Sequence, residues 1–447
     1  MQLARLWTVF MACVVALAVL WLLSLAPGAF TGGFWLTRRT LVYGSGVLAI
    51  GLMSVGVILA ARPVWFETPL GGLDKFYRLH KWLGIGAFAF AIAHWLIRMG
   101  PSWITKLSLF ELPPRPARGA PPVQAPPGFD VFRDLREPAA HVGEWTFYLL
   151  AILVLLALWK RFPYKYFFKT HKLMPAVYLV LVFHTFILMD LSYWTKPIGP
   201  ALAVLLSAGS VAALVSLSQK IGYLRKASGR VMNVRLYENN LLEVTVKLET
   251  AWRGHEAGQF AFVNFDDPED AHPFTISSPW RDDGLLTFTI KGLGDYTRTL
   301  ASTLYVGQGV VVEGPYGRFN FPDDHRRQIW IGGGVGITPF IARLKALAQQ
   351  GSIRRQVDLF YATSTQEEDF IKYLRELAEK AGVRFHVLVE SAHGRLTLDR
   401  LEALAPYWKD ADILFCGPLE FGRAMRDPMV AQGLPPSQFH QELFDMR

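Results

Sequence analysis

The sequence predicts a six-helix transmembrane bundle followed by an antiparallel β-barrel domain and a parallel-sheet α/β domain. Three observations support this fold class. Residues 1–219 carry a net charge of +11, whereas residues 220–447 carry −2. The first half contains six uncharged runs. Beyond Gly229 the apolar residues first recur at every second position, as in strands, and the pattern then alternates between strands and helices. A disordered chain, a repeat array and a small disulfide scaffold are excluded.

The uncharged runs define the expected spans. They cover residues 6–25, 40–61, 82–97, 145–159, 173–189 and 197–219. Three are long enough to cross a hydrocarbon layer of about 30 Å, and the three shorter runs reach that length with flanking residues whose long side chains extend to the interface. The first could also be a signal peptide, but its uncharged run exceeds a usual signal core, so we expect a retained helix in a membrane domain of 1–222.

Loop charge predicts the orientation. Basic residues concentrate between spans two and three, between spans four and five, and after span six. These segments share the cytoplasmic side if both termini are cytoplasmic, which leaves the connection 100–143, with its proline-rich stretch 112–128, outside. We therefore expect a multi-pass protein of the cell (inner) membrane with its β and α/β domains in the cytoplasm. Because the excess positive charge accompanies the spans, it does not indicate nucleic-acid binding.

Four histidines lie in or beside the expected spans. His80 and His94 are 14 apart on the third, and His171 and His184 are 13 apart on the fifth. An ionisable residue at membrane depth is usually functional, although hydrogen bonding between helices is the alternative. Fourteen helical residues rise about 21 Å, a separation that suits two stacked haems. We expect His80 with His171 near the cytoplasm and His94 with His184 near the outside, as electron carriers without an open iron position.

Two details qualify this ligand set. Thirteen residues leave His184 far round an ideal helix from His171, so we expect Pro175 to distort the fifth span. Cys13 and Cys416 have no zinc, iron–sulfur or CxxCH spacing, so any haem is held without thioether bonds.

Three arginines lie near the predicted outer haem. Arg98 follows His94 by one turn on the same face. We interpret it as an interfacial arginine, and the alternative is contact with a haem propionate or with a small anionic or polar electron acceptor. Arg38 and Arg39, at the outer start of the second span, leave the same two interpretations open.

Three features occur together: the stretch LHKWLG at 79–84, a second histidine fourteen residues after the first, and a pair of histidines 13 residues apart two helices later. Together they resemble the ferric reductase and NADPH oxidase transmembrane domain, over about 30–220. The resemblance implies two b-type haems (haem b) with their irons held by the four histidines.

Residues 228–322 have the pattern of an antiparallel barrel. A hairpin is expected over 231–247, with further strands at 259–265, 285–291 and 309–313. Two motifs there resemble the flavin domain of the ferredoxin-reductase superfamily. The resemblance implies FAD held by His272, Pro273, Phe274, Thr275, Ser277, Ser278, Lys291, Gly294, Asp295 and Thr297. It places Phe274 against the isoalloxazine, Thr275 near flavin N5, and Lys291, Gly294 and Thr297 at the diphosphate.

Residues 326–447 have the pattern of a dinucleotide domain. A strand at 328–331 precedes a glycine turn and a helix at 340–349, an arrangement that binds phosphate at the helix N-terminus. Strands are also expected at 357–361, 384–389 and 412–415. The turn resembles the nicotinamide-dinucleotide form of the same superfamily. The residues that this implies at the coenzyme are Gly334, Gly336, Thr338, Pro339, Cys416, Gly417 and Pro418, with Cys416 beside the nicotinamide.

The predictions of coenzyme preference and of the role of the C-terminus rest on fewer residues. Ser364 and Arg395 favour the 2′-phosphate of NADPH over NADH, although Glu367 and Glu368 lie close enough to keep NADH open. Relatives end with an aromatic ring over the flavin. Phe444 fits that place, and a terminal strand with one buried Phe is the alternative.

Together these parts predict an NAD(P)H-dependent oxidoreductase. Electrons are expected to pass from cytoplasmic NAD(P)H to FAD, since flavin takes two electrons and releases them singly, then through two haems to an extracytoplasmic acceptor, ferric iron or oxygen. Two alternatives are a haem-based membrane sensor with a regulatory cytoplasmic domain, and a subunit that donates electrons to a periplasmic redox protein.

Overall fold

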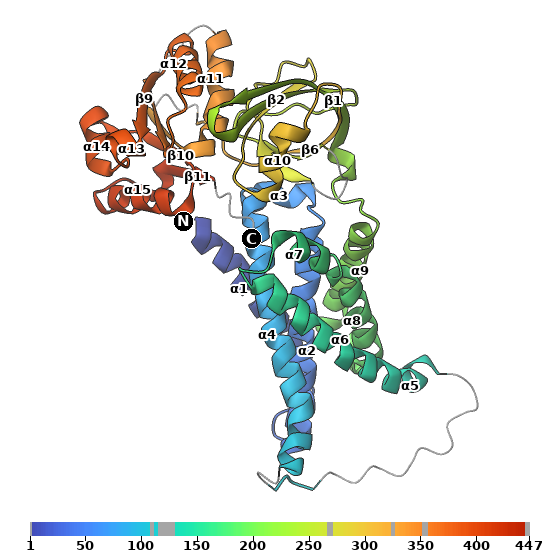
Figure 1. Ribbon diagram of the computed structural model, residues 1–447. Coiled ribbons are helices and arrows are strands. Elements are labelled where there is room, and N and C mark those ends of the chain that lie inside the picture. Colours follow the sequence, from blue (N-terminus) through green and yellow to red (C-terminus); the bar gives the residue numbers. More distant parts are fainter. Residues whose placement is uncertain are drawn as a thin grey trace. The chain divides into compact units, whose positions relative to one another are not determined.

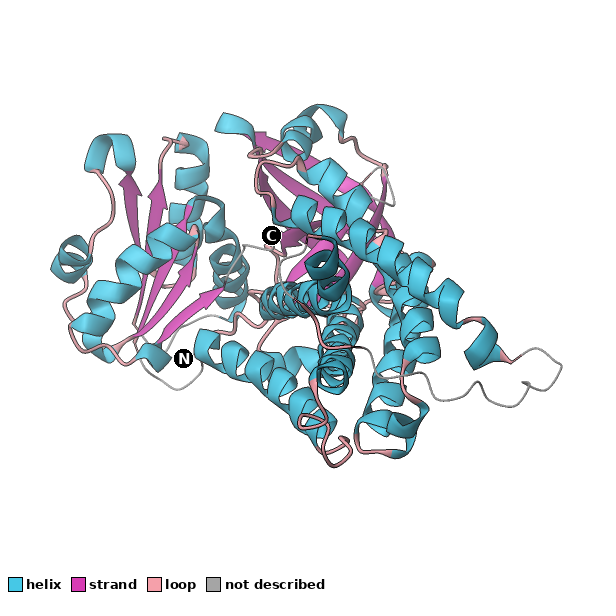
Figure 2. Cartoon of the chain, turned by 90° about the horizontal axis from the view of Figure 1, so that it is seen from below, coloured by secondary structure: helices cyan, strands magenta, loops and turns pink. Residues whose placement is uncertain are grey.

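The computed structural model describes residues 2–107, 111–114, 130–265, 271–322, 327–350 and 356–442. These residues form two compact units: a helical unit that spans 2–221 apart from 71–74, and a second unit of 222–442 with 71–74. All the described strands belong to the second unit (Figure 2).

The helical unit is made of long helices with short helices between them (Figure 1). In chain order the elements are α1 Gln2–Leu22, α2 Phe34–Ala60, α3 Val64–Leu70, α4 Leu73–Lys106, α5 Val131–Asp134, α6 Arg136–Leu158, α7 Tyr164–His171, α8 Met174–Leu188, η1 Leu191–Thr195 and α9 Ile198–Leu217. Within the described residues, six stretches are long and apolar enough to cross a membrane, and they coincide with the six expected spans. The proline-rich stretch 112–128 lies mostly outside the described residues.

The fifth span is interrupted. Helix α7 ends at His171 and α8 begins at Met174, with a turn between them. Pro175 has no N–H to donate to the carbonyl of His171, and its ring would collide with that carbonyl in a continuous helix. The break expected at this proline is therefore present between the two histidines of the span.

Small residues allow α2 to pack closely in the bundle. A Cβ on Gly44 would lie 2.4 Å from the Trp21 ring of α1, and one on Gly51 would lie 2.7 Å from Leu17. On another side of α2, Ser54 Oγ lies 2.9 Å from the hydroxyl of Tyr178 on α8. Close approach through small residues and interhelical hydrogen bonds is how helices associate where solvent is apolar.

The first part of the second unit is an antiparallel sheet of order β4-β3-β6-β1-β2-β5. Its strands are β1 Lys226–Tyr237, β2 Leu241–Leu248, β3 Phe260–Asn264, β4 His272–Thr275, β5 Leu285–Lys291 and β6 Gly309–Tyr316, with helix α10 Asp295–Thr303 after β5. The expected hairpin is confirmed, since β1 and β2 pair across Glu238–Asn240. The edge strands β4 and β5 meet only at the bridge from Ile276 to Phe288 among the described residues, so the sheet curls without a full closing ladder.

The second part is a parallel sheet of order β11-β10-β7-β8-β9 covered by helices. It contains β7 Gln328–Gly333, η4 Gly334–Ile337, α11 Thr338–Gln350, β8 Val357–Thr363, α12 Glu368–Lys380, β9 Arg384–Val389, α13 Glu390–His393, α14 Leu398–Leu404, β10 Asp412–Cys416, α15 Leu419–Ala431 and β11 Phe439–Glu442. Strands β7, β8 and β9 proceed in one direction and β10 returns to the other side of β7. Such a reversal of strand order is where doubly wound sheets bind ligands, outside the carboxyl ends of the strands.

Candidate functional site

The four membrane histidines face each other in two pairs. The ring centres of His80 on α4 and His171 on α7 are 5.9 Å apart, with the planes at 76°. Those of His94 on α4 and His184 on α8 are 6.4 Å apart, at 82°. The pairing is the one that the sequence predicts, and the break between α7 and α8 allows it.

Three of these histidines donate a hydrogen bond from Nδ1 to a backbone carbonyl. His80 donates to Gly56 O at 2.9 Å, His94 to Val42 O at 2.8 Å and His184 to Ala139 O at 2.9 Å. A carbonyl only accepts, so the proton is on Nδ1 and Nε2 keeps its lone pair. This is the tautomer that a metal ligand requires, oriented as in known metal sites. Among the described residues, the Nδ1 of His171 has no such partner.

The spacing of the rings fits one iron between each pair. Metal–nitrogen bonds of about 2.0 Å, plus roughly 1.1 Å from each nitrogen to its ring centre, give ring centres about 6.2 Å apart. The two observed values are 5.9 and 6.4 Å. No group of three or more His, Cys, Asp or Glu side chains able to hold a metal is present in the described part of the chain. The residues therefore fit two-ligand coordination of haem iron.

Glycines provide the room for two of these rings. A Cβ on Gly143 of α6 would lie 1.9 Å from Nδ1 of His184, and one on Gly46 of α2 would lie 3.2 Å from Nδ1 of His94. These glycines and the carbonyls of Val42, Gly56 and Ala139 were not predicted from the sequence. Glycine within an apolar helix is a signal for close packing, but only the fold shows what packs there.

The three arginines near the outer pair have different surroundings. Arg38 donates hydrogen bonds to the backbone carbonyls of Ile97 and Arg98, within α4, at 3.0 and 2.7 Å. Arg39 forms an ion pair with Asp190 at 2.6 Å. For Arg98, the interfacial interpretation and the alternative both stay predictions.

In the antiparallel domain, β4 places an aromatic group beside the predicted flavin position. His272 stacks on Tyr296 of α10 with ring centres 4.0 Å apart and planes at 6°. Phe274 is half-buried, and its ring centre lies 6.4 Å from that of His272. Thr275 is buried at the end of the strand. Pro273 lies between them in the ladder with β3. Their contacts with FAD stay predictions.

The hydroxyls of Ser277 and Ser278 are used inside the sheet. Ser277 Oγ donates to Thr287 O at 3.0 Å, and Ser278 Oγ accepts from Thr287 N at 3.0 Å. These bonds join the chain after β4 to β5. Both serines have a structural role here, and the prediction that they bind flavin gains no support from it.

The second predicted flavin motif forms the start of α10. Thr297 Oγ1 accepts from the backbone N–H of Leu293 and Gly294, both at 3.0 Å. Gly294 is the N-cap and Asp295 the first helical residue. A helix N-terminus with a glycine at its cap suits a phosphate, which agrees with the predicted diphosphate position.

Lys291 contacts the coenzyme domain. Its Nζ lies 2.9 Å from Glu367 Oε1 and 3.3 Å from Thr365 Oγ1, and the two side chains of the ion pair are 14% and 1% exposed. Glu367 also accepts from the Tyr361 hydroxyl at 3.1 Å. Burial, and then the carboxylate of Glu367, raise the pKa of Tyr361. The carboxylate of Glu367 is therefore used within the unit and is not directed to a ribose.

The glycine turn lies at the carboxyl ends of β7 and β10. A Cβ on Gly336 would lie 2.2 Å from the carbonyl oxygen of Cys416, so only glycine allows this contact. Gly334 has φ +57, and a Cβ on it would have no described atom within 4 Å, which leaves that side of the turn open. Thr338 and Pro339 then begin α11, with Thr338 buried.

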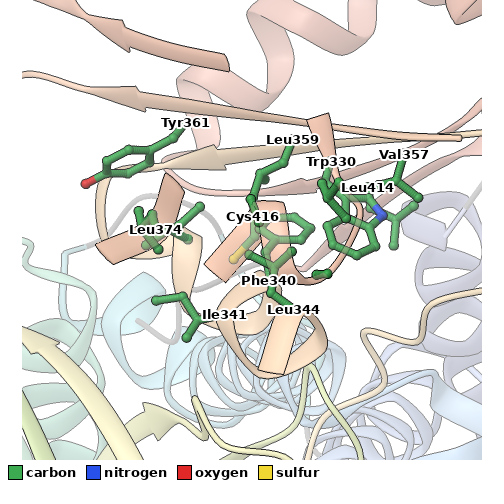
Figure 3. Packing of buried hydrophobic residues seen from close by; sticks show 14 of the residues in the cluster. Trp330, Phe340, Ile341, Leu344, Val357, Leu359, Tyr361, Leu374, Leu414 and Cys416 are labelled. Carbon is green, nitrogen blue, oxygen red and sulfur yellow. The ribbon is translucent and has the colours of Figure 1, made fainter. Parts of the chain in front are cut away.

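Cys416 ends β10 opposite Gly332 of β7 and is fully buried. Figure 3 shows its sulfur among the apolar side chains of the sheet and α11, near Phe340 and Ile341. Gly417 and Pro418 follow it, and Pro418 is the N-cap of α15. The position at the switch point agrees with the predicted place beside the nicotinamide, which stays a prediction.

The residues predicted to choose the coenzyme lie at neighbouring strand ends. Ser364 follows β8 and is exposed. Arg395 follows β9 and α13 and pairs with Glu390 at 2.7 Å, with its side chain 82% exposed. Phe444 lies outside the described residues. Phe439, in contrast, is buried in strand β11.

Comparison with known families divides the chain in the same order. A model of the ferric reductase like transmembrane component matches residues 45–182, one of an FAD-binding domain matches 226–320, and one of an oxidoreductase NAD-binding domain matches 330–427.

Curated relatives resemble part of the chain. The glycine betaine monooxygenase reductase subunit of Pseudomonas aeruginosa is 29% identical over 205 residues, which is 41% of this chain and 55% of the relative. The ferredoxin reductase component of 3-ketosteroid-9-alpha-monooxygenase from Rhodococcus rhodochrous is 32% identical over 174 residues, or 38% and 49%. The chain thus spans about half the length of these relatives.

Among solved structures, the flavohem-like FAD/NAD binding domain of nitric oxide dioxygenase from Vibrio cholerae matches 49% of this chain and 98% of its own, with 23% identity and a TM-score of 0.44. The three family models, in this order along the chain, together with the six stretches of membrane length in its described part, reproduce the expected architecture. The chain therefore contains a region that matches the ferric reductase like transmembrane component, followed by regions that match an FAD-binding domain and an oxidoreductase NAD-binding domain.

Proposed function

We propose that this protein carries electrons across the membrane from cytoplasmic NAD(P)H, through FAD and two b-type haems, to an acceptor outside, either ferric iron or oxygen. The two histidine pairs carry the proposal. Their ring centres, 5.9 and 6.4 Å apart, fit one iron each, and both pairs lie in stretches long and apolar enough to cross a membrane. Bound haem supplies a one-electron couple at each pair.

The chain's own residues prepare the two haem positions. The carbonyls of Gly56, Val42 and Ala139 hold three imidazoles in the tautomer with Nε2 available. Two histidines would hold each haem iron, and such a haem would supply electron transfer and not an acceptor-binding site. His80 with His171 is the inner pair in this proposal, and His94 with His184 the outer pair.

In the second unit, the residues orient two flat rings for hydride transfer. FAD accepts two electrons together and passes them on singly, which matches a two-electron donor to a one-electron carrier. Phe274 and Thr275 would hold the flavin ring, and Gly334 and Gly336 would let the coenzyme phosphates approach the backbone. Cys416 would close the nicotinamide site from the sheet side. Ser364 and Arg395 favour NADPH, and Phe444 would cover the flavin when no coenzyme is bound.

The test is haem content and haem reduction in purified full-length protein. We expect two haems per FAD, both reduced by NADPH without oxygen, as followed by absorbance. His94→Leu and His184→Leu should each leave one haem per FAD and leave flavin reduction unchanged.

His141→Leu is the matched control. His141 lies on α6 and is exposed, and its Nε2 lies 3.8 Å from Glu137 Oε1. It should keep both haems. Two haems per FAD in the His94 and His184 variants would contradict the proposed ligand pairs. Absence of haem reduction by NADPH in the wild-type protein would contradict the proposed route of the electrons.

A second candidate is supported by the relatives. Those described above are reductase components of multicomponent monooxygenases by name. The protein would then donate electrons to a separate redox protein outside the membrane. Acceptor reduction by the purified protein alone would contradict this candidate, because a donating subunit needs its partner.

A further inference from the structure

The loop that joins β8 to α12 is held by a lysine of the antiparallel sheet. Lys291 ends β5, and its Nζ lies 2.9 Å from Glu367 Oε1 and 3.3 Å from Thr365 Oγ1. Thr365 Oγ1 also donates to Glu367 Oε1, at 3.0 Å. Both partners lie between the end of β8 at Thr363 and the start of α12 at Glu368. One charged side chain therefore fixes two positions of this loop.

The hairpin between β1 and β2 contacts the same loop. Asn239 Nδ2 donates to Gln366 O at 3.3 Å, and Glu238 Oε2 accepts from Glu368 N–H at 2.8 Å. Asn239 and Asn240 have φ values of 54° and 60°, a left-handed conformation that Asn adopts more readily than most residues. Each of the residues 365–368 thus has a bond to the antiparallel part.

Glu367 is the centre of these contacts. Its carboxylate is 1% exposed and accepts from Lys291, from Thr365 and, at 3.1 Å, from the Tyr361 hydroxyl. Figure 3 shows the Tyr361 ring at the edge of an apolar cluster, with its hydroxyl directed away from the other labelled side chains. A buried carboxylate is costly unless hydrogen-bond donors surround it. Because these bonds have defined directions, they restrict the loop to a narrow range of positions.

Ser364 is exposed on this loop. Its two neighbours bond to each other, since Thr363 Oγ1 accepts from Thr365 N–H at 3.3 Å and donates to Thr365 O at 3.1 Å. Ser364 follows the carboxyl end of β8, the edge at which doubly wound sheets bind ligands. The residue predicted to favour NADPH is therefore presented by a segment that the antiparallel part holds in place.

We infer that Glu367 is a positioning residue for coenzyme selectivity, because it holds Ser364 where the 2′-phosphate of NADPH binds. The inference rests on the proposed function, in which Ser364 favours NADPH. A loop that is already ordered loses little conformational entropy when the phosphate binds, so the network strengthens that binding. NADH has no 2′-phosphate and does not use the loop. The network therefore acts on the choice between the two coenzymes and not on hydride transfer.

Binding of two nucleotides to the purified full-length protein tests this role. Adenosine 2′,5′-bisphosphate carries the phosphate that distinguishes NADPH, and adenosine 5′-monophosphate lacks it. Calorimetry gives both affinities, expressed per mole of bound FAD so that unfolded protein is not counted. Glu367→Gln should weaken binding of the bisphosphate roughly three- to tenfold, the effect of about one lost hydrogen bond. It should change binding of the monophosphate by less than about twofold.

Thr365 provides a milder pair of variants. Thr365→Val keeps the size of the side chain and removes the hydroxyl that contacts Lys291 and Glu367, so it should shift the ratio of the two affinities in the same direction. Thr365→Ser keeps the hydroxyl and should retain the wild-type ratio. In steady-state kinetics, Glu367→Gln and Thr365→Val should raise the KM for NADPH by a similar factor, whereas kcat and the KM for NADH should not change.

Lys345→Met is the control for a general loosening between the two sheets. Lys345 of α11 contacts Glu243 of β2 at 3.4 Å, with exposures of 19% and 17%, and has no described bond to residues 363–368. It should leave the ratio of the two affinities unchanged. An unchanged ratio in Glu367→Gln and Thr365→Val, equal weakening of both nucleotides, or the same shift in Lys345→Met would each overturn the inference.

The proposed electron route is tested separately, by reduction of haem. A wild-type protein that reduces haem but binds both nucleotides alike would contradict the choice of NADPH and this role of Glu367 together, and would leave the route intact. Failure of NADPH to reduce haem would contradict the route, even where Glu367→Gln shifts the ratio as expected.

Discussion

At the scale of single residues, a hydrogen bond to a carbonyl and the absence of one side chain determine where the His184 ring lies. His184 donates to Ala139 O, and its ring lies where a Cβ on Gly143 would be, 1.9 Å from Nδ1. Gly56 provides a natural comparison, because its Cβ would lie 3.8 Å from Nδ1 of His80, an ordinary contact.

Gly143→Ala should therefore displace the ring of His184 and lower the haem content from two to about one per FAD, since the packed helices leave the ring little room to move. Gly56→Ala should keep both haems. Haem and flavin absorbance of the purified variants gives the ratio. Two haems in the Gly143 variant would mean that the ring has another acceptable position.

His255 is a second residue with a definite proton state. Its Nε2 donates to Ser278 O at 2.8 Å, and its Nδ1 is buried without a described partner. Burial lowers the pKa of His255 below 6.5, against the opposing effects of the Ser278 bond and the charge of Asp283. The folded state then binds fewer protons than the unfolded state between this lowered pKa and 6.5.

Stability of the second unit should accordingly decrease as pH decreases below 6.5, because the unfolded state gains the proton first. His255→Gln, which cannot titrate, should make the melting temperature less dependent on pH between 7 and 5. Melting is followed by flavin fluorescence. Identical pH dependence in wild type and variant would show that His255 titrates alike in both states.

At the scale of elements, the antiparallel and parallel sheets are joined by a buried ion pair. Lys291 ends β5 and Glu367 precedes α12, and their charged atoms are 2.9 Å apart. Glu368 N–H also donates to Glu238 Oε2 at 2.8 Å. An exposed pair, Arg230 with Glu249, joins residues of the antiparallel sheet with exposures of 61% and 52%.

Removing one partner of the buried pair leaves a charge without compensation, at a cost of about 3–5 kcal/mol. Lys291→Met and Glu367→Gln should each destabilise the second unit, and the double variant should lose at least about 1 kcal/mol less than the sum. The same cycle on Arg230 and Glu249 should give a coupling of about 0–1 kcal/mol. Denaturant unfolding measures both cycles. Additive effects at Lys291 and Glu367 would show that the contact contributes little.

At the scale of the whole molecule, the two halves of the chain differ in net charge. The helical half carries +11 and the rest −2. The positive residues gather in the connections that we assign to the cytoplasm, including 220–226 after α9. The connection 100–143 is assigned to the opposite side. This orientation places the flavin and coenzyme domains where NAD(P)H is available.

Labelling with a membrane-impermeant maleimide tests this orientation in intact cells. Ser102 and Ser218 are exposed, and each lies at the C-terminal end of its span. Because the third and sixth spans are expected to cross in opposite directions, the two serines are expected on opposite sides of the membrane. In a Cys13→Ser background, with Cys416 buried, Ser102→Cys should react from outside and Ser218→Cys only after lysis. The reverse pattern would place the second unit outside the cell.

The sequence by itself determined the features that depend on local pattern. Uncharged runs gave six spans, the period-two segments gave the β1–β2 hairpin, and the spacing of glycines gave the turn between β7 and α11. Apolar periodicity and backbone freedom act over a few residues, so they can be recognised in the sequence alone. The matches to the three family models could be anticipated for the same reason, because the motifs are short and follow one another in order.

Only the tertiary structure decided what each functional side chain contacts. The carbonyl that accepts from His94 is 52 residues away, and the carboxylate that pairs with Lys291 is 76 residues away. An ideal helix placed His171 and His184 on different faces, and the turn between α7 and α8 brought each to its partner on α4. Ser277 and Ser278 have the residue type expected at a flavin site, and in the structure their hydroxyls form hydrogen bonds with the backbone of Thr287 in β5. Such partners come together only when distant segments pack, because hydrogen bonds and ion pairs depend on position in space and not on neighbours in sequence.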